Sequence, residues 1–323
     1  MAGLDIGRSE VRMVEFSGSR IQTAQLACCT REALPDGAIG DEGIGNLRQV
    51  MEAVSRLWGK SGSQARQVAI AIPSSRALTQ IVAIPAHSSQ AQRAALAERH
   101  AESLLPYPPA QALLDFRIIG PTHNAPDQLD MLIAAVRRDD VEDRIAVAES
   151  LGLQTMVADI ESHAAAAALN RTLPAAPASS VFAMANLETH GALLSLCCAG
   201  RVVGERQLDI GHRQLQHDLQ QYDGDQSDVL AGYLAQAAAH LAGVLQTLQQ
   251  QTSCVPSHIV LTGAGATISG MEEAVHKRTT ISTAVATPFA GMVPAPAIDR
   301  AQIAMDGPAC ATACGLALRR FDR

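Results

Sequence analysis

The chain has 323 residues with a formal net charge of −7, and aromatic side chains make up only 3% of it. This length suggests about two domains. The negative charge and few aromatic rings argue against nucleic-acid binding, which needs positive patches and stacking platforms. Seven cysteines without a C-x-x-C pair indicate reduced thiols in a cytoplasmic protein. Because we find neither a signal-peptide pattern nor an apolar run of about eighteen residues, we expect membrane contact only through a partner.

The first segment, GLDIGRSEVRMVEF at 3–16, predicts two strands joined by a tight turn at Gly7. Glycine lets the turn pass close to a bound group, and backbone N–H groups in such a turn can face an anion. Asp5, at the end of the first strand, could hold a hydrated metal ion. A plain hairpin with a solvated Asp explains the same residues, so the rest of the chain has to decide between the two.

The next residues predict the remainder of a first unit and then a separate module. The first unit continues with a strand over 21–34, a helix over 42–60 and a strand over 67–73. The module covers 76–150, and its predicted elements are a strand over 77–85, a helix over 88–105 with Ser88 or Ser89 as N-cap, strands over 112–120 and 129–137, and a helix over 139–152.

The rest of the chain repeats the order of the first unit. A strand over 153–160, an alanine-rich helix over 161–170 and a linker over 171–180 lead to it. The second unit is predicted to contain three strands between 181 and 211, helices over 212–222 and 228–251, a strand entering a glycine-rich turn over 258–266, a helix over 267–278 and a last helix over 309–321. Two similar halves that face a cleft commonly bind a ligand there.

These segments together resemble the actin-like ATPase superfamily and, within it, the PilM family of type IV pilus assembly proteins. The resemblance covers nearly the whole chain, and its most specific part is the block with the PYP turn and LDF. It is carried by GLDIGRSEVRMVEF, QVAIAIPSS, ESLLPYPPAQALLDFRIIG, LDMLIAAVRRDDVEDRIAVAESLGLQTMVADIESHA, LTGAGATISGMEEAV and GLALRRF.

The resemblance implies an α/β actin-like ATPase fold, a duplicated ribonuclease H-like architecture of two domains with an FtsA-type 1C subdomain inserted. Subdomain 1A would combine 1–75, 151–178 and 305–323. Subdomain 1C would cover 76–150. The second half (2A/2B), with its adenosine-binding segment, would cover 179–304.

The resemblance also implies that ATP and Mg²⁺ bind between the halves. Asp5 would lie near the magnesium ion through water, and Glu161 would orient the attacking water. The other residues implied in nucleotide binding are Gly7, Arg8, Ser9 and Arg12 in the first half and Asn186 in the second. Gly263, Gly265 and Gly270 would let the backbone approach adenine and ribose, although a plain strand-to-helix connection explains these glycines too.

The second phosphate turn departs from the superfamily pattern, which usually reads Asp-x-Gly there. This chain has Asn186-Leu187-Glu188, so the turn lacks the charge of the Asp and gains a carboxylate. Two unit charges about 4 Å apart repel by roughly 1–4 kcal/mol near water. Arg8 replaces a small residue, Arg12 a frequent lysine and His212 a common glycine. We therefore expect nucleotide binding with at most weak ATPase activity.

The function that the PilM resemblance implies is a cytoplasmic scaffold at the inner membrane. It would capture the N-terminal cytoplasmic peptide of the membrane protein PilN in a groove between subdomains 1A and 1C. Through PilN it would link the PilN–PilO ring to the motor ATPases, and self-association into a homo-oligomer stays open. Candidate groove residues are Ile84, Leu104, Leu105 and Tyr107, for which a place in the core is the simpler interpretation.

Two alternatives stay open at this point. A small-molecule kinase of the same fold would need a catalytic base, for which Asp159 is the candidate, but the inserted module resembles no sugar-binding domain. An FtsA-like polymerising protein would carry a C-terminal amphipathic membrane helix, which we do not find after GLALRRFDR. Phosphotransfer to sugars would support the first alternative, and filaments formed with ATP would support the second.

Overall fold

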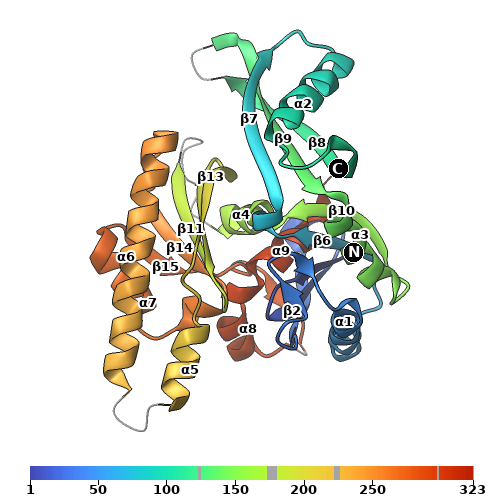
Figure 1. Ribbon diagram of the computed structural model, residues 1–323. Coiled ribbons are helices and arrows are strands. Elements are labelled where there is room, and N and C mark those ends of the chain that lie inside the picture. The colour runs from blue at the N-terminus through green and yellow to red at the C-terminus, as the bar shows by residue number, and fades with distance from the viewer. Residues whose placement is uncertain (123–124, 173–179, 222–225, 297, 323) are drawn as a thin grey trace.

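The structure is a computed structural model that describes residues 1–122, 125–172, 180–221, 226–296 and 298–322. Two lobes, each built on a twisted sheet, lie side by side, and a smaller module projects from one end (Figure 1). Helices α4 (Glu161–Thr172) and α9 (Ala311–Leu318) lie between the two sheets. The predicted linker over 171–180 falls mostly outside the described residues.

The first lobe has a six-stranded sheet in the order β10-β6-β1-β2-β3-β16. Its strands are β1 (Ala2–Ile6), β2 (Glu10–Ser17), β3 (Gln25–Ala33), β6 (Gln67–Ile72), β10 (Gln154–Ile160) and β16 (Val293–Pro294). β1 is antiparallel to β2 and parallel to β6, which is buried along nearly its whole length. The predicted hairpin at 3–16 is therefore part of the central strands of this sheet.

Helices α1 (Leu47–Ser61) and α3 (Arg138–Glu149) cover one face of this sheet. Asn46 caps α1 by accepting a hydrogen bond from the Gln49 N–H at 3.2 Å. Val147 and Ala148 of α3 pack into the same core as Val50 and Leu57 of α1. The structure thus places α3 against the first lobe, although our predicted module of 76–150 includes it. The division into subdomains remains a proposal.

The second lobe repeats this plan with a five-stranded sheet in the order β13-β12-β11-β14-β15. Its strands are β11 (Val181–Leu187), β12 (Ala192–Cys198), β13 (Arg201–Leu208), β14 (His258–Thr262) and β15 (Ser282–Val285). β11 is antiparallel to β12 and parallel to β14, as β1 is to β2 and β6. The predicted duplication is therefore present in the topology.

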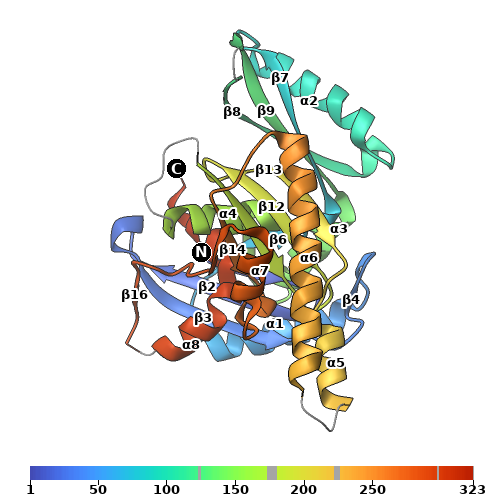
Figure 2. The ribbon, with the colours of Figure 1, turned by 90° about the vertical axis from the view of Figure 1, so that its left-hand side faces the viewer.

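Three helices accompany this second sheet: α5 (Arg213–Gln221), α6 (Ser227–Thr252) and α7 (Met271–Thr279). α6 runs along the outer flank of the lobe (Figures 1 and 2). Among the described residues, it is the one helix whose length and composition would allow it to cross a membrane. Leu241, Leu245 and Leu248 lie in the core of the lobe, so α6 packs one apolar face against the lobe while much of its remaining surface is exposed.

The projecting module is a three-stranded antiparallel sheet in the order β7-β9-β8, covered by one helix. Its elements are β7 (Ala77–Pro85), α2 (Gln90–Leu104), β8 (Ala112–Thr122) and β9 (Ala125–Arg137). Ser89, one of the two predicted N-caps, forms a capping box with Gln92. Each element of the module was predicted, with ends shifted by a few residues.

The helices between the lobes approach each other very closely. A Cβ atom on Gly315 of α9 would lie 1.7 Å from the backbone oxygen of Ala164 of α4, so only glycine fits there. The run of alanines in α4, four of which are buried, allows this contact. This confirms the close packing that the alanine run predicts.

Several short elements were not predicted. They are β4 (Ile39–Gly40), β5 (Gly43–Ile44), β15, β16 and α8 (Arg300–Asp306). β16 pairs with β3 of the first sheet, and Ile303 of α8 packs on the same lobe. Residues that we placed in the second half therefore return to the first lobe before α9.

Candidate functional site

The two lobes meet where the β1–β2 turn faces the β11–β12 turn. The Ser9 and Thr189 hydroxyl oxygens of these turns lie 3.1 Å apart. Beside this contact is a cavity of about 370 Å³, lined by residues of both lobes. It includes the predicted residues Asp5, Gly7, Arg8, Ser9, Arg12, Glu161 and Asn186. The structure therefore brings together the predicted phosphate and metal residues from segments far apart in the chain.

Arg12 is the centre of an ion-pair network at this contact. It lies opposite Asp5 in the β1–β2 ladder, and its side chain is almost fully buried. It donates to Asp5 at 3.3 Å, to Glu10 at 2.8 Å and to Glu188 of the other lobe at 2.6 Å. The unfavourable carboxylate that we expected at Glu188 is therefore neutralised by Arg12. The Arg12 guanidinium thus connects the two lobes.

Burial and charge shift the pKa values of this network. Burial raises the pKa of Asp5, Arg12 lowers it and Glu188 raises it, with a net pKa of about 6. Burial alone would lower the pKa of Arg12, but Glu188, Asp5 and Glu10 together raise it well above its usual value. Arg12 is therefore a permanent cation, whereas Asp5 is partly protonated near pH 6.

Glu161 begins α4 and faces the cavity from the first lobe. Its carboxyl accepts hydrogen bonds from the Asn186 side-chain amide at 3.1 Å and from the Ser74 N–H at 3.4 Å. Burial, with Asp5 and Glu188 nearby, raises its pKa to about 8. Glu161 is thus mostly protonated at neutral pH, so it can orient a water molecule by hydrogen bonds but is a poor general base.

Two further residues in this cleft were not singled out from the sequence. Thr189 contacts Ser9 and also His212, whose Nε2 lies 3.3 Å from the Thr189 hydroxyl. Arg144, from α3, reaches the cavity with a side chain that is almost fully buried. The sequence does carry a signal for Arg144, since it shares the buried face of α3 with Val141 and Val147.

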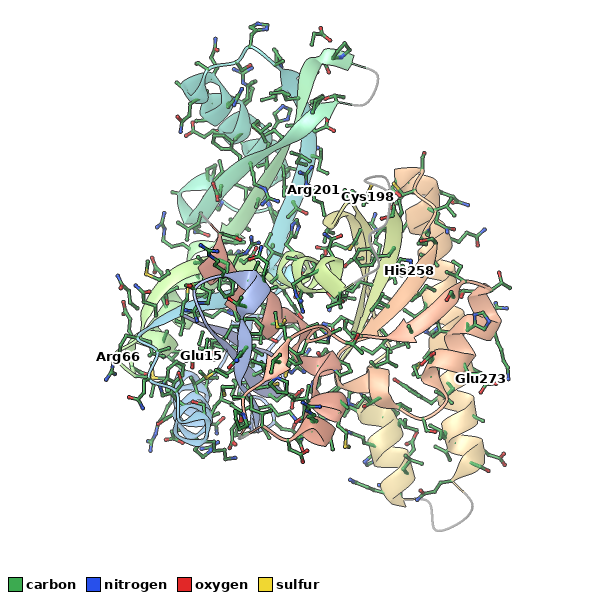
Figure 3. The ribbon with its side chains drawn as sticks, turned by 180° about the vertical axis from the view of Figure 1, so that it is seen from behind. Glu15, Arg66, Cys198, Arg201, His258 and Glu273 are labelled. Carbon is green, nitrogen blue, oxygen red and sulfur yellow. The ribbon has the colours of Figure 1, made fainter. Side chains whose placement is uncertain are left out.

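The three glycines assigned to adenosine lie outside the lining of this cavity. Gly263 and Gly265 pack against the end of β11; a Cβ on Gly263 would lie 2.4 Å from the Leu187 backbone oxygen, at a φ of +82°. Gly270 lines a separate groove between α6 and α7, together with Glu273. Figure 3 shows Glu273 at the outer side of the second lobe, away from the first. Their role in binding adenosine remains a prediction.

The four candidate groove residues lie in the module or just after α2. Ile84 is only 2% exposed and belongs to the core of the module, so a surface role for its side chain is a correction to our expectation. Leu104, Leu105 and Tyr107 are half-buried. The Arg137 guanidinium lies over the Tyr107 ring, 4.5 Å from its centroid.

The cleft fits the phosphates of a nucleotide better than it fits a bare metal ion. Within the described residues, no group of three or more His, Cys, Asp or Glu side chains could hold a metal. Magnesium in nucleotide sites is held largely by phosphates and water, with one or two carboxylates. Asp5 could supply that carboxylate. Arg144, buried and without an ion-pair partner among the described residues, could receive an anion.

The duplicated lobes, the two facing turns and the cleft between them define an actin-like ATPase fold. Solved structures show the same fold: the ethanolamine utilization protein EutJ from Carboxydothermus hydrogenoformans matches with a TM-score of 0.52 and 13% identity, covering 98% of this chain and 88% of EutJ. MreB 5 of Spiroplasma citri, bound to AMPPNP, matches with a TM-score of 0.50 and 10% identity, covering 98% and 95%.

The family model for the type IV pilus assembly protein PilM matches residues 3–228 and 221–321, and the chain therefore belongs to the PilM family. A solved structure of a PilM-PilN type IV pilus biogenesis complex is similar over 100% of this chain and 98% of that one. Its TM-score is 0.86 and the identity is 20%. The resemblance identified from the sequence is thereby confirmed.

Proposed function

We propose that this chain is a scaffold of type IV pilus assembly that captures the N-terminal cytoplasmic peptide of PilN. The observation that carries the proposal is the full-length match to the PilM family and to the structure of a PilM-PilN complex. The protein would work in the cytoplasm at the inner membrane and reach the membrane only through PilN. By this link it would connect the PilN–PilO ring to the motor ATPases.

Exposed strand edges between the module and the first lobe support peptide capture. β10 is an edge strand of the six-stranded sheet, and β7 is an edge strand of the module. Met156 of β10 is 48% exposed and Ile81 of β7 is 38% exposed, although both are large apolar side chains. An extended peptide can add to such an edge through main-chain hydrogen bonds and place its apolar side chains against such residues.

The test is fluorescence anisotropy with a labelled synthetic peptide of the PilN N-terminus from the same organism. We expect Met156→Glu to weaken binding about tenfold or more, because it places a charge against the apolar peptide. Met305→Glu is the matched control, since Met305 is 70% exposed and belongs to α8, which lies at the opposite end of the molecule from the module (Figure 1). Ile81→Glu shows whether the edge of β7 contributes. No binding by the wild-type protein would refute peptide capture.

We also propose that ATP binds between the two lobes and is hydrolysed slowly or not at all. The phosphates would lie between the two turns, with Gly7, Arg8 and Ser9 on one side, and Mg²⁺ near Asp5. Slow turnover is expected because the raised pKa of Glu161 makes it a poor general base, and because Glu188 occupies Arg12, which could otherwise donate to a phosphate. Calorimetric titration with Mg-ATP should show binding that Asp5→Ala weakens. If neither the wild-type protein nor the Asp5→Ala variant binds Mg-ATP, the chain is a scaffold that works without nucleotide.

The structure weakens the alternative of a small-molecule kinase. Asp159, the candidate base, accepts a hydrogen bond from the Arg319 Nε at 2.8 Å and is not among the residues that line the cavity. An aspartate held by an arginine outside the cleft cannot take a proton from a substrate inside it.

Whether the protein forms a homo-oligomer can be measured by light scattering of the purified protein, with and without the PilN peptide.

A further inference from the structure

Arg144 is a buried cation without a matching anion. Its residue is 1% exposed, yet it is one of those that line the cleft between the lobes. Within the described part of the chain, its one hydrogen bond goes from Nη1 to the backbone oxygen of Asp140 at 3.0 Å, and its Nε has no partner. Buried charges are normally paired because removing them from water is costly.

The nearby carboxylates do not supply that pair. Asp140 is bound by Arg76, whose guanidinium lies 3.0 Å from it. Asp5 is bound by Arg12, and Glu161 accepts from Asn186 and Ser74. Burial lowers the pKa of Arg144, and the charges of Asp140, Asp5 and Glu161 offset this only in part. The guanidinium of this cavity-lining residue therefore has no carboxylate partner among the described residues, and its buried Nε makes no hydrogen bond.

We propose that Arg144 binds the terminal phosphate of the nucleotide. This inference rests on the proposed ATP binding between the lobes. Arg144 lines the cleft from the first lobe, as Asp5 and Glu161 do, whereas Gly263 and Gly265 lie beyond the end of β11 in the second. A nucleotide with its adenosine toward those glycines would place its last phosphate beside Arg144. A planar guanidinium can donate two parallel hydrogen bonds to such a phosphate.

Arg144 would then distinguish ATP from ADP. Loss of the hydrogen bonds between Arg144 and the charged last phosphate should lower the affinity for ATP about 10- to 100-fold. Because ADP lacks the last phosphate, its affinity should be nearly independent of Arg144. Peptide capture would then be able to respond to which nucleotide is bound, through a residue on a helix that also packs against β9 and β10.

The experiment titrates the full-length protein calorimetrically with Mg-ATP, Mg-ADP and inorganic phosphate. We expect Arg144→Gln to weaken Mg-ATP about 10- to 100-fold and Mg-ADP less than about twofold. Arg144→Lys keeps the charge but cannot donate two parallel hydrogen bonds, so its affinity for Mg-ATP should lie between those of the wild-type protein and Arg144→Gln. It replaces Arg144→Gln in the experiment if that variant does not fold. Arg138→Gln is the matched control, because Arg138 begins the same helix with an exposed side chain.

Melting temperatures without nucleotide separate this role from a structural one. Removing an unpaired buried charge should leave the melting temperature of the free protein unchanged or raise it, and should reduce the rise caused by Mg-ATP. A lower melting temperature with unchanged affinity for Mg-ATP would overturn the assignment. The assignment would also be wrong if Arg144→Gln weakened ATP and ADP binding equally, or if the wild-type protein bound inorganic phosphate as tightly as ATP. If the wild-type protein binds no Mg-ATP, the proposed nucleotide site itself is wrong.

Discussion

The β1–β2 turn of the first lobe and the β11–β12 turn of the second occupy equivalent places but carry different chemistry. Asp5 and Asn186 are each the second-last residue of the first strand of their hairpin. Two residues later stand Gly7 and Glu188. In the first lobe the ladder partner of Asp5 is Arg12, whereas in the second the partner of Asn186 is Leu193. The backbone is therefore duplicated, but the charges are not.

The difference shows that the charges balance across the two lobes and not within each one. The first turn contributes the cation Arg12 and the second turn contributes Glu188, and their ion pair of 2.6 Å joins the lobes. A second turn with the usual glycine would leave Nη2 of Arg12 without its Glu188 partner and able to donate to a phosphate. The substitution at Glu188 thus replaces part of the attraction for a nucleotide with an internal contact.

The largest effect is expected from removing the shared cation. Arg12→Gln leaves Asp5, Glu10 and Glu188 without their partner while the side chain of residue 12 stays buried. Breaking a buried ion pair on one side typically costs about 3–5 kcal/mol. We expect a loss of that size in the free energy of unfolding, measured with urea. The double variant Arg12→Gln, Glu188→Gln should recover part of it.

Arg48→Gln is the matched control for this measurement. Arg48 pairs with Glu52 on the surface of α1, with 88% of its side chain exposed. An exposed pair of this kind contributes less than about 0.5 kcal/mol. If Arg12→Gln costs no more than Arg48→Gln, the contact between the turns is not a stabilising one.

A second contrast lies in how the two turns are supported. A Cβ on Gly211 would lie 2.2 Å from the Thr189 backbone oxygen of the second turn, whereas a Cβ on Gly7 would lie 3.1 Å from the Glu10 oxygen. We expect Gly211→Ala to cost about 1–3 kcal/mol by overpacking and Gly7→Ala to cost less than about 1 kcal/mol. Thermal melts of both variants test this; equal losses would contradict the contrast.

The chemical difference between the turns can be removed by Glu188→Gly. This change gives the second turn the glycine that the first has at Gly7 and removes a carboxylate from the phosphate site. Because the change releases Nη2 of Arg12 from its pair with Glu188, that nitrogen can donate to a phosphate, and we expect Mg-ATP affinity to rise about tenfold. Glu188→Gln should have a similar effect, since the charge is responsible. Calorimetric titration that shows a weaker affinity in both variants would contradict this view.

The sequence was sufficient for the hairpins and for most elements of the duplicated lobes, because these rest on local patterns. The N-cap at Ser89 and the apolar run that forms β6 can be recognised from neighbouring residues in the sequence, without knowing what they contact in the fold. β16 could not be, because two residues, Val293 and Pro294, have no periodicity, and their pairing with Gln25 and Leu26 spans most of the chain.

The site divides in the same way. Asp5 and Gly7 can be predicted as site residues from one short segment. The neutralisation of Glu188 by Arg12 cannot be predicted in this way, because 176 positions separate the two residues. The same holds for Arg144, whose importance depends on Asp140 being already bound by Arg76. Charge pairing inside a cleft is a property of the folded arrangement, and no spacing in the sequence specifies it.

The last prediction concerns pH and a carboxyl that accepts a hydrogen bond across the two lobes. Glu161 belongs to the first lobe and accepts from Asn186 of the second. Its pKa is about 8 in the folded protein and has an ordinary value of 4.5. Folding therefore takes up a proton between these values, so the stability that Glu161 contributes is full below pH 4.5 and is lost as the pH rises through about 8.

Glu161→Gln should remove this dependence because glutamine does not titrate. The difference in unfolding free energy between Glu161→Gln and the wild-type protein should grow in favour of the variant from pH 6.5 to pH 8, by at most about 1.4 kcal/mol per pH unit. Histidines titrate in both proteins, so their contribution largely cancels in the difference. A constant difference across this range would mean that Glu161 is ionised in the folded protein. The carboxyl would then be able to act as a base toward water, and slow hydrolysis would need another cause.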